Sequence, residues 1–199
     1  MNNKKIYFCS LLILIVFFAG CSSKSTNVLK PEYEQNWVKI IAILPVENKT
    51  TDNKAPQLLR SKLLDQLYYK GYSKVPLAII DQKLESLYSS DKKGNVGIIA
   101  PQVLNDLVGA DAVMYCTLLE SSSSLGFFYA PVTISLQCEL RRAQSGEVLW
   151  RGKYKTTSRN FDFTRKSLEM KSCESYENVI EEVVNKTIET LPDGPNLRG

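Results

Sequence analysis

The residues that could carry out chemistry are limited by one missing type, because the 199 residues include no histidine. Without imidazole there is no Ser-His or Cys-His nucleophilic pair and no histidine acid–base catalyst. The commonest ligand of transition metals is missing as well. Serine lies beside lysine at Ser61 and Lys62, but a Ser-Lys pair needs a buried, neutral lysine, and Lys62 falls on the solvent side of the expected helix. We therefore predict no catalytic residue, no cofactor and no metal site, and a protein that is not an enzyme.

The segment that precedes Cys21 has the composition of a secretion signal. Lys4 and Lys5 stand before the apolar run 6–19, which has 14 residues. A membrane-spanning helix needs roughly 17–25 apolar residues, whereas the apolar part of a signal peptide has about 7–15. The length favours a signal peptide, with an uncleaved anchor and ordinary cleavage as the alternatives.

Cys21 is the first candidate functional residue. The stretch Phe18 to Cys21, "FAGC", resembles the bacterial lipobox, in which a signal peptidase cuts just before a diacylated cysteine. Two or more acyl chains hold a protein stably on a bilayer. Ser22 in place of aspartate implies the outer membrane, by the rule for Gram-negative lipoproteins. We predict a signal peptide over 1–20, a lipidated Cys21 with a flexible tether over 21–36, and a periplasmic domain over 37–199.

Three cysteines remain in the body of the chain, at 116, 138 and 173. They lack the CxxC spacing that is typical of zinc or thioredoxin-like sites. Cys116 and Cys138 fall on two expected strands, at equal distances from the turn between them, so they can face each other. In an oxidising periplasm they can form a disulfide; the alternative is two small buried apolar side chains. Cys173 would be left without a partner.

The body alternates between apolar strand patterns and helical stripes. Leu59, Leu63 and Leu67 lie at helical spacing between Pro56 and Gly71, which suit the two ends of a helix. Residues 131–140 alternate between apolar and polar, as a half-buried strand does. The expected order is β-α-β-α-α-β-β-β-α, with strands at 38–48, 72–80, 110–120, 131–140 and 147–154 and helices at 54–71, 81–88, 100–109 and 172–191. We predict a single α/β domain with one mixed sheet and helices packed on it.

The weak charge excludes one class of partner. The net charge is +4 and falls to +2 once Lys4 and Lys5 are removed with the leader. So small a charge gives no argument for nucleic acid. The cations at 141, 142, 151, 153 and 155 indicate a solvated hairpin face, with binding to anionic lipid as the alternative.

Several stretches together resemble a known family. They are "IAILPVENKT", "LLRSKLLDQLYYKGY", "VGADAVMYCTLLE", "SGEVLWRG" and "LPDGP". With the lipobox they resemble conserved bacterial lipoproteins of unknown function, known through a surface antigen of pathogenic neisseriae. The resemblance implies an α/β fold similar to the N-terminal domain of TolB and to the periplasmic domains of CsgG and LpoB. It also implies a CsgG-like lipoprotein as a neighbour in an envelope complex, and it carries over no catalytic residues.

Phe127, Phe128 and Tyr129 are the candidate partner-contact residues. They lie in "SSSSLGFFYAP", the connection between two expected strands, which replaces the polar, Trp-containing connection more usual in the family. Exposed aromatic side chains indicate a protein or membrane contact. The alternative is a loop that folds back and buries them.

Our leading hypothesis is an outer-membrane-anchored, non-enzymatic lipoprotein that serves as a structural or assembly component of an envelope complex. Its partner would be a CsgG-like lipoprotein or a second copy, because an uncapped outer strand permits strand addition. The alternative is an activator or ligand-binding periplasmic module, similar in role to LpoB.

Overall fold

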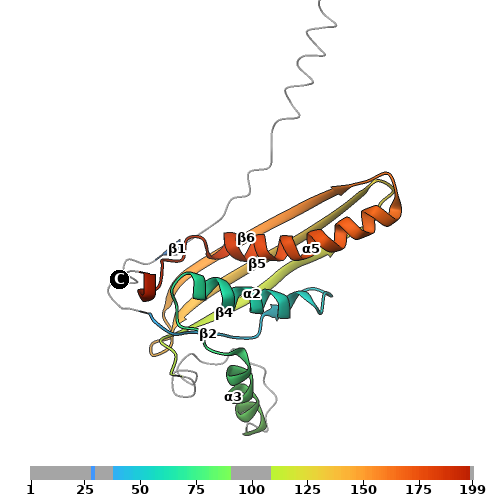
Figure 1. The fold of residues 1–199 in the computed structure, drawn as a ribbon. Coiled ribbons are helices and arrows are strands. Elements are labelled where there is room, and N and C mark those ends of the chain that lie inside the picture. The colour runs from blue at the N-terminus through green and yellow to red at the C-terminus, as the bar shows by residue number, and fades with distance from the viewer. Residues whose placement is uncertain (1–27, 30–37, 91–108, 198–199) are drawn as a thin grey trace, which may run out of the picture.

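A computed structural model describes residues 28–29, 38–90 and 109–197 (Figure 1). It confirms the predicted class: one α/β domain with a mixed sheet in the order β1-β6-β5-β4-β2, where β3 also pairs with β4. The predicted helix at 100–109 lies outside the described residues. The elements are β1 (Val28–Leu29), β2 (Ile41–Ile43), β3 (Glu47–Asn48), α2 (Ala55–Tyr69), α3 (Leu77–Ser90), β4 (Ala112–Ser123), β5 (Tyr129–Arg142), β6 (Val148–Phe161), α5 (Arg165–Ile188) and the short 3-10 helix η2 (Pro195–Leu197).

Three long antiparallel strands form most of the sheet. β4, β5 and β6 are paired almost from end to end, from Ala112 opposite Arg142 to Tyr129 opposite Phe161. The register of β4 shifts between Leu118 and Glu120. Such a bulge inserts an extra residue, and here it turns Ser121 toward the helices while Glu120 lies on the opposite face beside Lys155.

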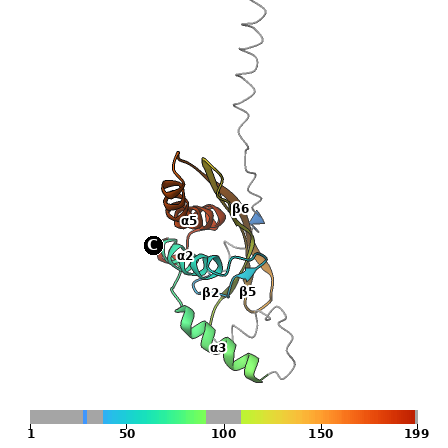
Figure 2. The ribbon, with the colours of Figure 1, turned by 90° about the vertical axis from the view of Figure 1, so that its right-hand side faces the viewer.

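One face of the sheet is covered by α2 and α5, which lie on the same side in both views (Figures 1 and 2). The predicted alternation of β5 is confirmed, because its apolar positions are buried against these helices. The predicted apolar side of the last helix is confirmed too. Of the positions predicted to face the core on β5 and α5, the buried ones are Val132, Ile134, Leu136, Cys138, Leu140, Ile180, Val183, Val184, Thr187 and Ile188.

Gly152 is where α5 comes nearest to the sheet. A Cβ atom at this position would collide with the carbonyl oxygen of Thr187 and with the Trp150 ring. The indole is fully buried and its Nε1 donates to Oγ1 of Thr190 at 3.2 Å. The glycine therefore lets a helix backbone lie directly on a strand, with a tryptophan filling the space beside it.

On the other face of the sheet, the helix that packs among the described residues is α3, at one end. Ile80 and Leu84 of this helix pack on Ala42, Leu44 and Val113 of the neighbouring strands. The strand predicted at 72–80 is wrong: only Ser73 makes a bridge, to Ile40, and α3 begins at Leu77. Proline lacks an N–H and has a fixed φ that suits a helix start. Pro76 therefore directly precedes the helix, and its carbonyl accepts from the Ile80 amide at 3.4 Å.

Three further boundaries differ from expectation. The strand predicted over 38–48 is two short strands, because Pro45 cannot donate to a ladder and interrupts the pairing. The last helix begins at Arg165, seven residues early, where Oγ1 of Thr164 accepts from the Ser167 amide at 3.3 Å. Val28 and Leu29, within the predicted tether, pair with β6 as β1.

No helix in the part of the chain that the structure describes has both the length and the apolar character required to cross a membrane.

Gly152→Ala is expected to destabilise the domain by about 1–3 kcal/mol, the usual cost of overpacking a filled core. The added methyl group has no space, because backbone of α5 and the buried indole lie against it. Urea denaturation followed by circular dichroism measures the change. Lys153→Ala, one residue along on the exposed side of β6, is the matched control and is expected to stay within about 0.5 kcal/mol; equal stability of both variants would contradict the close approach.

Candidate functional site

The predicted aromatic contact lies at the free end of the long hairpin, and it is larger than predicted. We define the aromatic tip as Leu125, Phe127, Phe128, Tyr129, Phe161 and Phe163. Phe127 and Phe163 are each 92% exposed, and Phe128 and Phe161 are 59% and 62% exposed. A loop that folds back and buries Phe127 and Phe128 is therefore not what the structure shows; Tyr129 is partly buried.

Sheet register brings the two halves of the aromatic tip together. Tyr129 begins β5 opposite Phe161 at the end of β6, and their ring centroids are 4.9 Å apart. Phe128 and Phe163 meet edge to face at 6.2 Å. The sequence analysis missed Phe161 and Phe163. The signal that could have found them is the antiparallel pairing itself, which places the end of β6 beside the start of β5.

Backbone groups at the aromatic tip are bonded within the hairpin. The Gly126 amide donates to the Tyr129 carbonyl at 2.9 Å, and the Ser124 amide donates to the Pro131 carbonyl at 3.3 Å. The Asp162 amide donates to the Phe128 carbonyl at 3.3 Å, which joins the two connections. The exposed rings therefore stand on a hydrogen-bonded frame.

Several cations lie close in sequence to Phe161 and Phe163 of the aromatic tip. Arg159, Arg165 and Lys166 are exposed, and Arg165 pairs loosely with Glu169 at 3.3 Å. Nζ of Lys171 lies 2.8 Å from the Asp162 carboxylate. This hydrogen bond holds the pKa of Asp162 below its ordinary value, so the carboxylate stays charged and paired.

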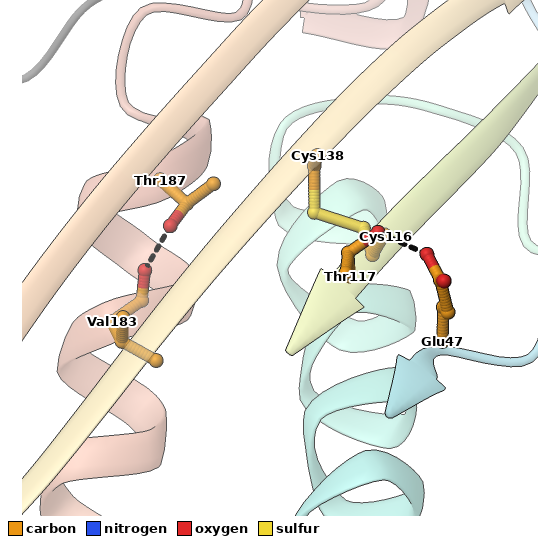
Figure 3. The surroundings of a disulfide bond; sticks show 6 residues. All are labelled: Glu47, Cys116, Thr117, Cys138, Val183 and Thr187. Atoms are coloured by element: carbon orange, nitrogen blue, oxygen red, sulfur yellow. Dashed lines mark hydrogen bonds between the residues drawn. A yellow bond between two sulfur atoms is a disulfide. The ribbon is translucent and has the colours of Figure 1, made fainter. Parts of the chain in front are cut away.

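Cys116 and Cys138 lie directly opposite each other on β4 and β5 (Figure 3). Their Cα atoms are 4.1 Å apart and the structure joins their Sγ atoms, beneath the helices, with both residues buried. This spacing is close to the roughly 4.5 Å of an antiparallel pair that is not hydrogen-bonded. Cys173 is free and exposed on α5.

The surroundings of this cysteine pair are structural in character. Figure 3 shows Oγ1 of Thr117, on the opposite face of β4, donating to the Glu47 carboxylate of β3, at 2.9 Å. On α5, Oγ1 of the buried Thr187 donates to the Val183 carbonyl at 2.6 Å. The first hydrogen bond joins β4 to β3, and the second lies within α5.

A polar cluster joins three elements at Asp52. Its carboxylate accepts from the hydroxyls of Ser121, at 2.7 Å, and Tyr176, and from the amides of Lys54 and Ala55. Burial raises the pKa of Asp52, but these hydrogen bonds outweigh it and hold the pKa below its ordinary value. Burial and the same carboxylate raise the pKa of Tyr176. The cluster therefore keeps an ionised acid and a neutral phenol, an arrangement that fastens α2 to β4 and α5.

The Ser-Lys reading of residues 61 and 62 is not supported by the geometry. Nζ of Lys62 lies 2.7 Å from the Glu181 carboxylate, and this hydrogen bond raises the pKa of Lys62. A lysine held in its charged form cannot act as a base. Within the described ranges, no three Cys, Asp or Glu side chains are grouped so that they could hold a metal ion.

A buried arginine was also missed by the sequence analysis. Arg60 is 8% exposed; its Nη2 and Nε donate to the Ile43 carbonyl at 2.9 and 3.2 Å, and its Nη1 pairs with Asp81 at 2.6 Å. Arg60 thus bonds the carbonyl of the last residue of β2, shortly before Pro45. Asp81, the first residue of the helix predicted at 81–88, lies inside α3 and pairs with Arg60.

The stretches that carry the family resemblance have structural tasks. In "GADAV", Asp111 accepts from the Lys39 and Ile40 amides at 2.8 and 2.9 Å, which fastens the start of β2. In "LPDGP", Gly194 donates to the Lys70 carbonyl at 2.6 Å. A Cβ on Gly194 would lie 2.5 Å from the Gly71 carbonyl oxygen. The motifs therefore specify the fold.

The outer edge of β6 is the second feature of the surface. β1 pairs only with Trp150 and Arg151, and from Gly152 to Phe161 the described residues place no strand beside β6. Side chains at 151, 153, 155, 157, 159 and 161 are exposed on the sheet face that the long helices leave uncovered. We call Arg151, Lys153, Lys155 and Arg159 the basic stripe.

The comparisons with known proteins agree with this architecture. The lipoprotein GNA1162 of Neisseria meningitidis is 20% identical, with 71% of this chain and 97% of that chain aligned and a TM-score of 0.55. A PelC dodecamer of Paraburkholderia phytofirmans is 14% identical, with 86% and 98% aligned and a TM-score of 0.57. The chain thus has a small α/β fold, a mixed sheet with two long helices on one face, that is similar to the fold of a bacterial lipoprotein.

The particular family follows from the sequence match. Residues 31–195 match the family described as "Putative lipoprotein GNA1162-like", and the chain belongs to it. A curated putative lipoprotein of Neisseria meningitidis serogroup B is 23% identical over 142 residues. That match covers 71% of this chain and 66% of the relative's length.

The pairing of Cys116 with Cys138 predicts a specific thiol count. Unfolded without reductant, the mature body is expected to bind one thiol label, on Cys173, and after reduction three. Intact mass spectrometry of protein from the oxidising compartment counts the labels, with Cys173→Ala as the control; three labels without reduction would contradict the bridge.

Removing the bridge by Cys116→Ala with Cys138→Ala is expected to lower the free energy of unfolding by about 3 kcal/mol, since the bridge closes a loop of 22 residues.

Proposed function

We propose that this protein is an outer-membrane-anchored lipoprotein that works without catalysis, as a structural or assembly component of a cell-envelope complex. Cys21 holds it on the bilayer through its acyl chains, and the domain faces the periplasm. The observation that supports the role is the free edge of β6. It presents backbone donors and acceptors over residues 152–161 to a partner strand.

The charges on this edge indicate which partner strand fits. Lys153 and Arg159 form no ion pair within the described residues, while Arg151 and Lys155 pair with Glu139 and Glu120, each at 2.5 Å. Like charges placed directly opposite on paired strands are destabilising. An acidic or neutral strand is therefore the preferred partner, and a CsgG-like lipoprotein is the candidate that the family resemblance supplies.

A homo-oligomer is the second form that this edge permits. Two copies of β6 paired about a two-fold axis at the centre of the basic stripe would set cation against cation, as for Lys153 opposite Arg159. A head-to-tail arrangement, in which β6 meets a different surface of the next copy, avoids this repulsion and closes into a ring when the rotation allows. The PelC structures, whose fold is similar, are dodecamers, which supports testing for a ring here.

The alternative role, an activator or ligand-binding module, is less well supported. A small-molecule site is usually a concave, mostly apolar pocket formed between elements. One hollow on the described surface lies along the outer side of α5, and its lining is unlike such a pocket, because it consists of polar side chains of that helix: Asn178, Glu181, Glu182, Asn185 and Lys186.

Cys21→Ser is expected to abolish acylation and to release the protein from the outer-membrane fraction. The serine hydroxyl is not the nucleophile that the lipid-transfer step uses, and the residual contacts of the domain replace two or more acyl chains only weakly. Metabolic labelling with an alkyne fatty acid, followed by membrane fractionation, makes the measurement. Cys173→Ser is the matched control and should keep the label; an unlabelled parent protein would contradict the anchor.

A photo-crosslinking residue at Lys153 is expected to yield adducts with a protein partner in living cells. Its side chain lies on the free edge of β6, within reach of a strand about 4.8 Å away. Mass spectrometry of the adducts identifies the partner, and Arg159→Glu in the same protein is expected to lower the yield with an acidic partner, because it reverses a charge of the basic stripe.

The same crosslinker at Asn178, exposed on α5 away from the sheet edge, is the control and should give no specific adduct. Anchored protein that gives no adduct at Lys153 but gives one at Asn178 would show that the partner binds the helix side, and the edge proposal would fail.

A further inference from the structure

The aromatic tip raises a separate question, because it lies at the opposite end of β6 from β1. Its four phenylalanines are each more than half exposed. Clusters of this kind on the surface of a protein mark a contact with a protein or a membrane. The charge, backbone bonding and position of the tip together indicate which contact it makes.

The first observation is the absence of charge in the connection itself. Residues 121–131 include no Asp, Glu, Lys or Arg. The hairpin can therefore enter an apolar phase without burying a charge, which would be costly there. The one acid beside the rings, Asp162, is already held by Lys171 at 2.8 Å.

The second observation concerns the backbone. A lipid interior offers no hydrogen-bond partners, so an inserting segment must satisfy its own amides and carbonyls. The Gly126, Ser124 and Asp162 amides donate to carbonyls within the tip, and β4 and β5 stay paired as far as Ser123 and Val132. This frame suits shallow insertion better than a loop with free backbone groups would.

The third observation is that cations lie next to the rings in the sequence. Arg159, Arg165 and Lys166 are exposed and lie two or three residues from Phe161 or Phe163, and the basic stripe continues from Arg159 along the sheet face that the long helices leave uncovered. Apolar rings beside lysine and arginine are typical of segments that lie in the bilayer interface, where the rings enter the acyl boundary and the cations meet anionic headgroups. A stable protein interface takes about 20–30 residues a side, far more than the six of the aromatic tip.

The fourth observation is distance. Six residues lie between Cys21 and Val28, so the seven Cα–Cα steps that join them span at most about 25 Å. From Arg151, the partner of Val28, β6 runs ten residues to Phe161, about 34 Å. A bilayer that holds Cys21 can thus touch the aromatic tip when the hairpin is inclined by less than about 45° to the membrane plane, which follows from these two lengths.

We propose that the aromatic tip is a second membrane contact: Phe127, Phe128 and Phe163 insert into the interface of an anionic bilayer while Arg159, Arg165 and Lys166 meet its headgroups. The proposal takes the Cys21 anchor of the proposed function as its starting point. With the anchor at one end and the tip at the other, the sheet lies inclined to the membrane, and the free edge of β6 is held at a fixed height. The lipid chemistry required is an anionic phospholipid such as phosphatidylglycerol.

The test uses the acylated, full mature chain in vesicles of phosphatidylethanolamine and phosphatidylglycerol, with Phe127→Trp as the reporter. Trp37→Phe removes one native tryptophan, and Trp150 is fully buried. We expect the reporter emission to shift to the blue and to be quenched by lipid brominated in the upper acyl chain. Tyr69→Trp, 69% exposed at the end of α2, is the matched control and should show neither effect.

Three further outcomes decide the proposal. Replacing Phe128 and Phe163 by serine should reduce the quenching of the reporter at position 127 by about tenfold, since most of the buried apolar area is then lost. A reporter that shifts to the blue without being quenched, and that loses this shift when the vesicles are diluted to one protein each, would show that a second copy covers the tip. Equal quenching of both reporters, or of neither, would overturn the proposal. A protein that carries no acyl label but whose reporter is still quenched would contradict the anchor at Cys21 and leave the insertion of the aromatic tip standing. The two proposals can therefore be contradicted separately.

Discussion

The close approach of α5 to β6 at Gly152 is the constraint on which the rest of the structure depends. Because residue 152 has no side chain, the Thr187 carbonyl region of the helix lies against the strand, and the buried Trp150 fills the adjoining space. This contact sets α5 lengthwise over β5 and β6, as Figure 1 shows. α2 lies beside it on the same face. Among the described residues, most of the opposite face and the outer edge of β6 beyond Arg151 are left uncovered.

That arrangement separates the stabilising interactions from the surfaces available to partners. The cysteine pair, the Asp52 cluster and Arg60 all lie where helices meet the sheet or each other, and they join elements that are distant in sequence. The motifs shared with the family serve the same end. The exposed features, by contrast, are the basic stripe and the aromatic tip. The basic stripe lies on the face of β6 that the long helices do not cover, and the aromatic tip lies at the far end of this strand.

The role that we propose is to hold surfaces in place. The aromatic tip and the outer edge of β6 lie on one long hairpin, so a contact at the tip also fixes the position of the edge. The fold is shared with GNA1162 and PelC structures at 20% and 14% identity, and such distant likeness fits a scaffold whose surface differs from protein to protein. In this chain the uncharged aromatic connection is the part that departs from the family pattern.

The sequence by itself determined the features that depend on local periodicity: the apolar stripes of the helices, the alternation of β5, the facing positions of Cys116 and Cys138, and the α/β class. It misassigned 72–80, because Val75 to Ile80 suits a strand or a helix equally until Pro76 is seen to start one. Only the tertiary structure brought Phe161 beside Tyr129 and Phe163 beside Phe128. It also buried Arg60 against the Ile43 carbonyl and set α5 on Gly152. These depend on sheet register and helix placement, which are set by contacts between residues far apart in the chain and leave no periodic signal within it.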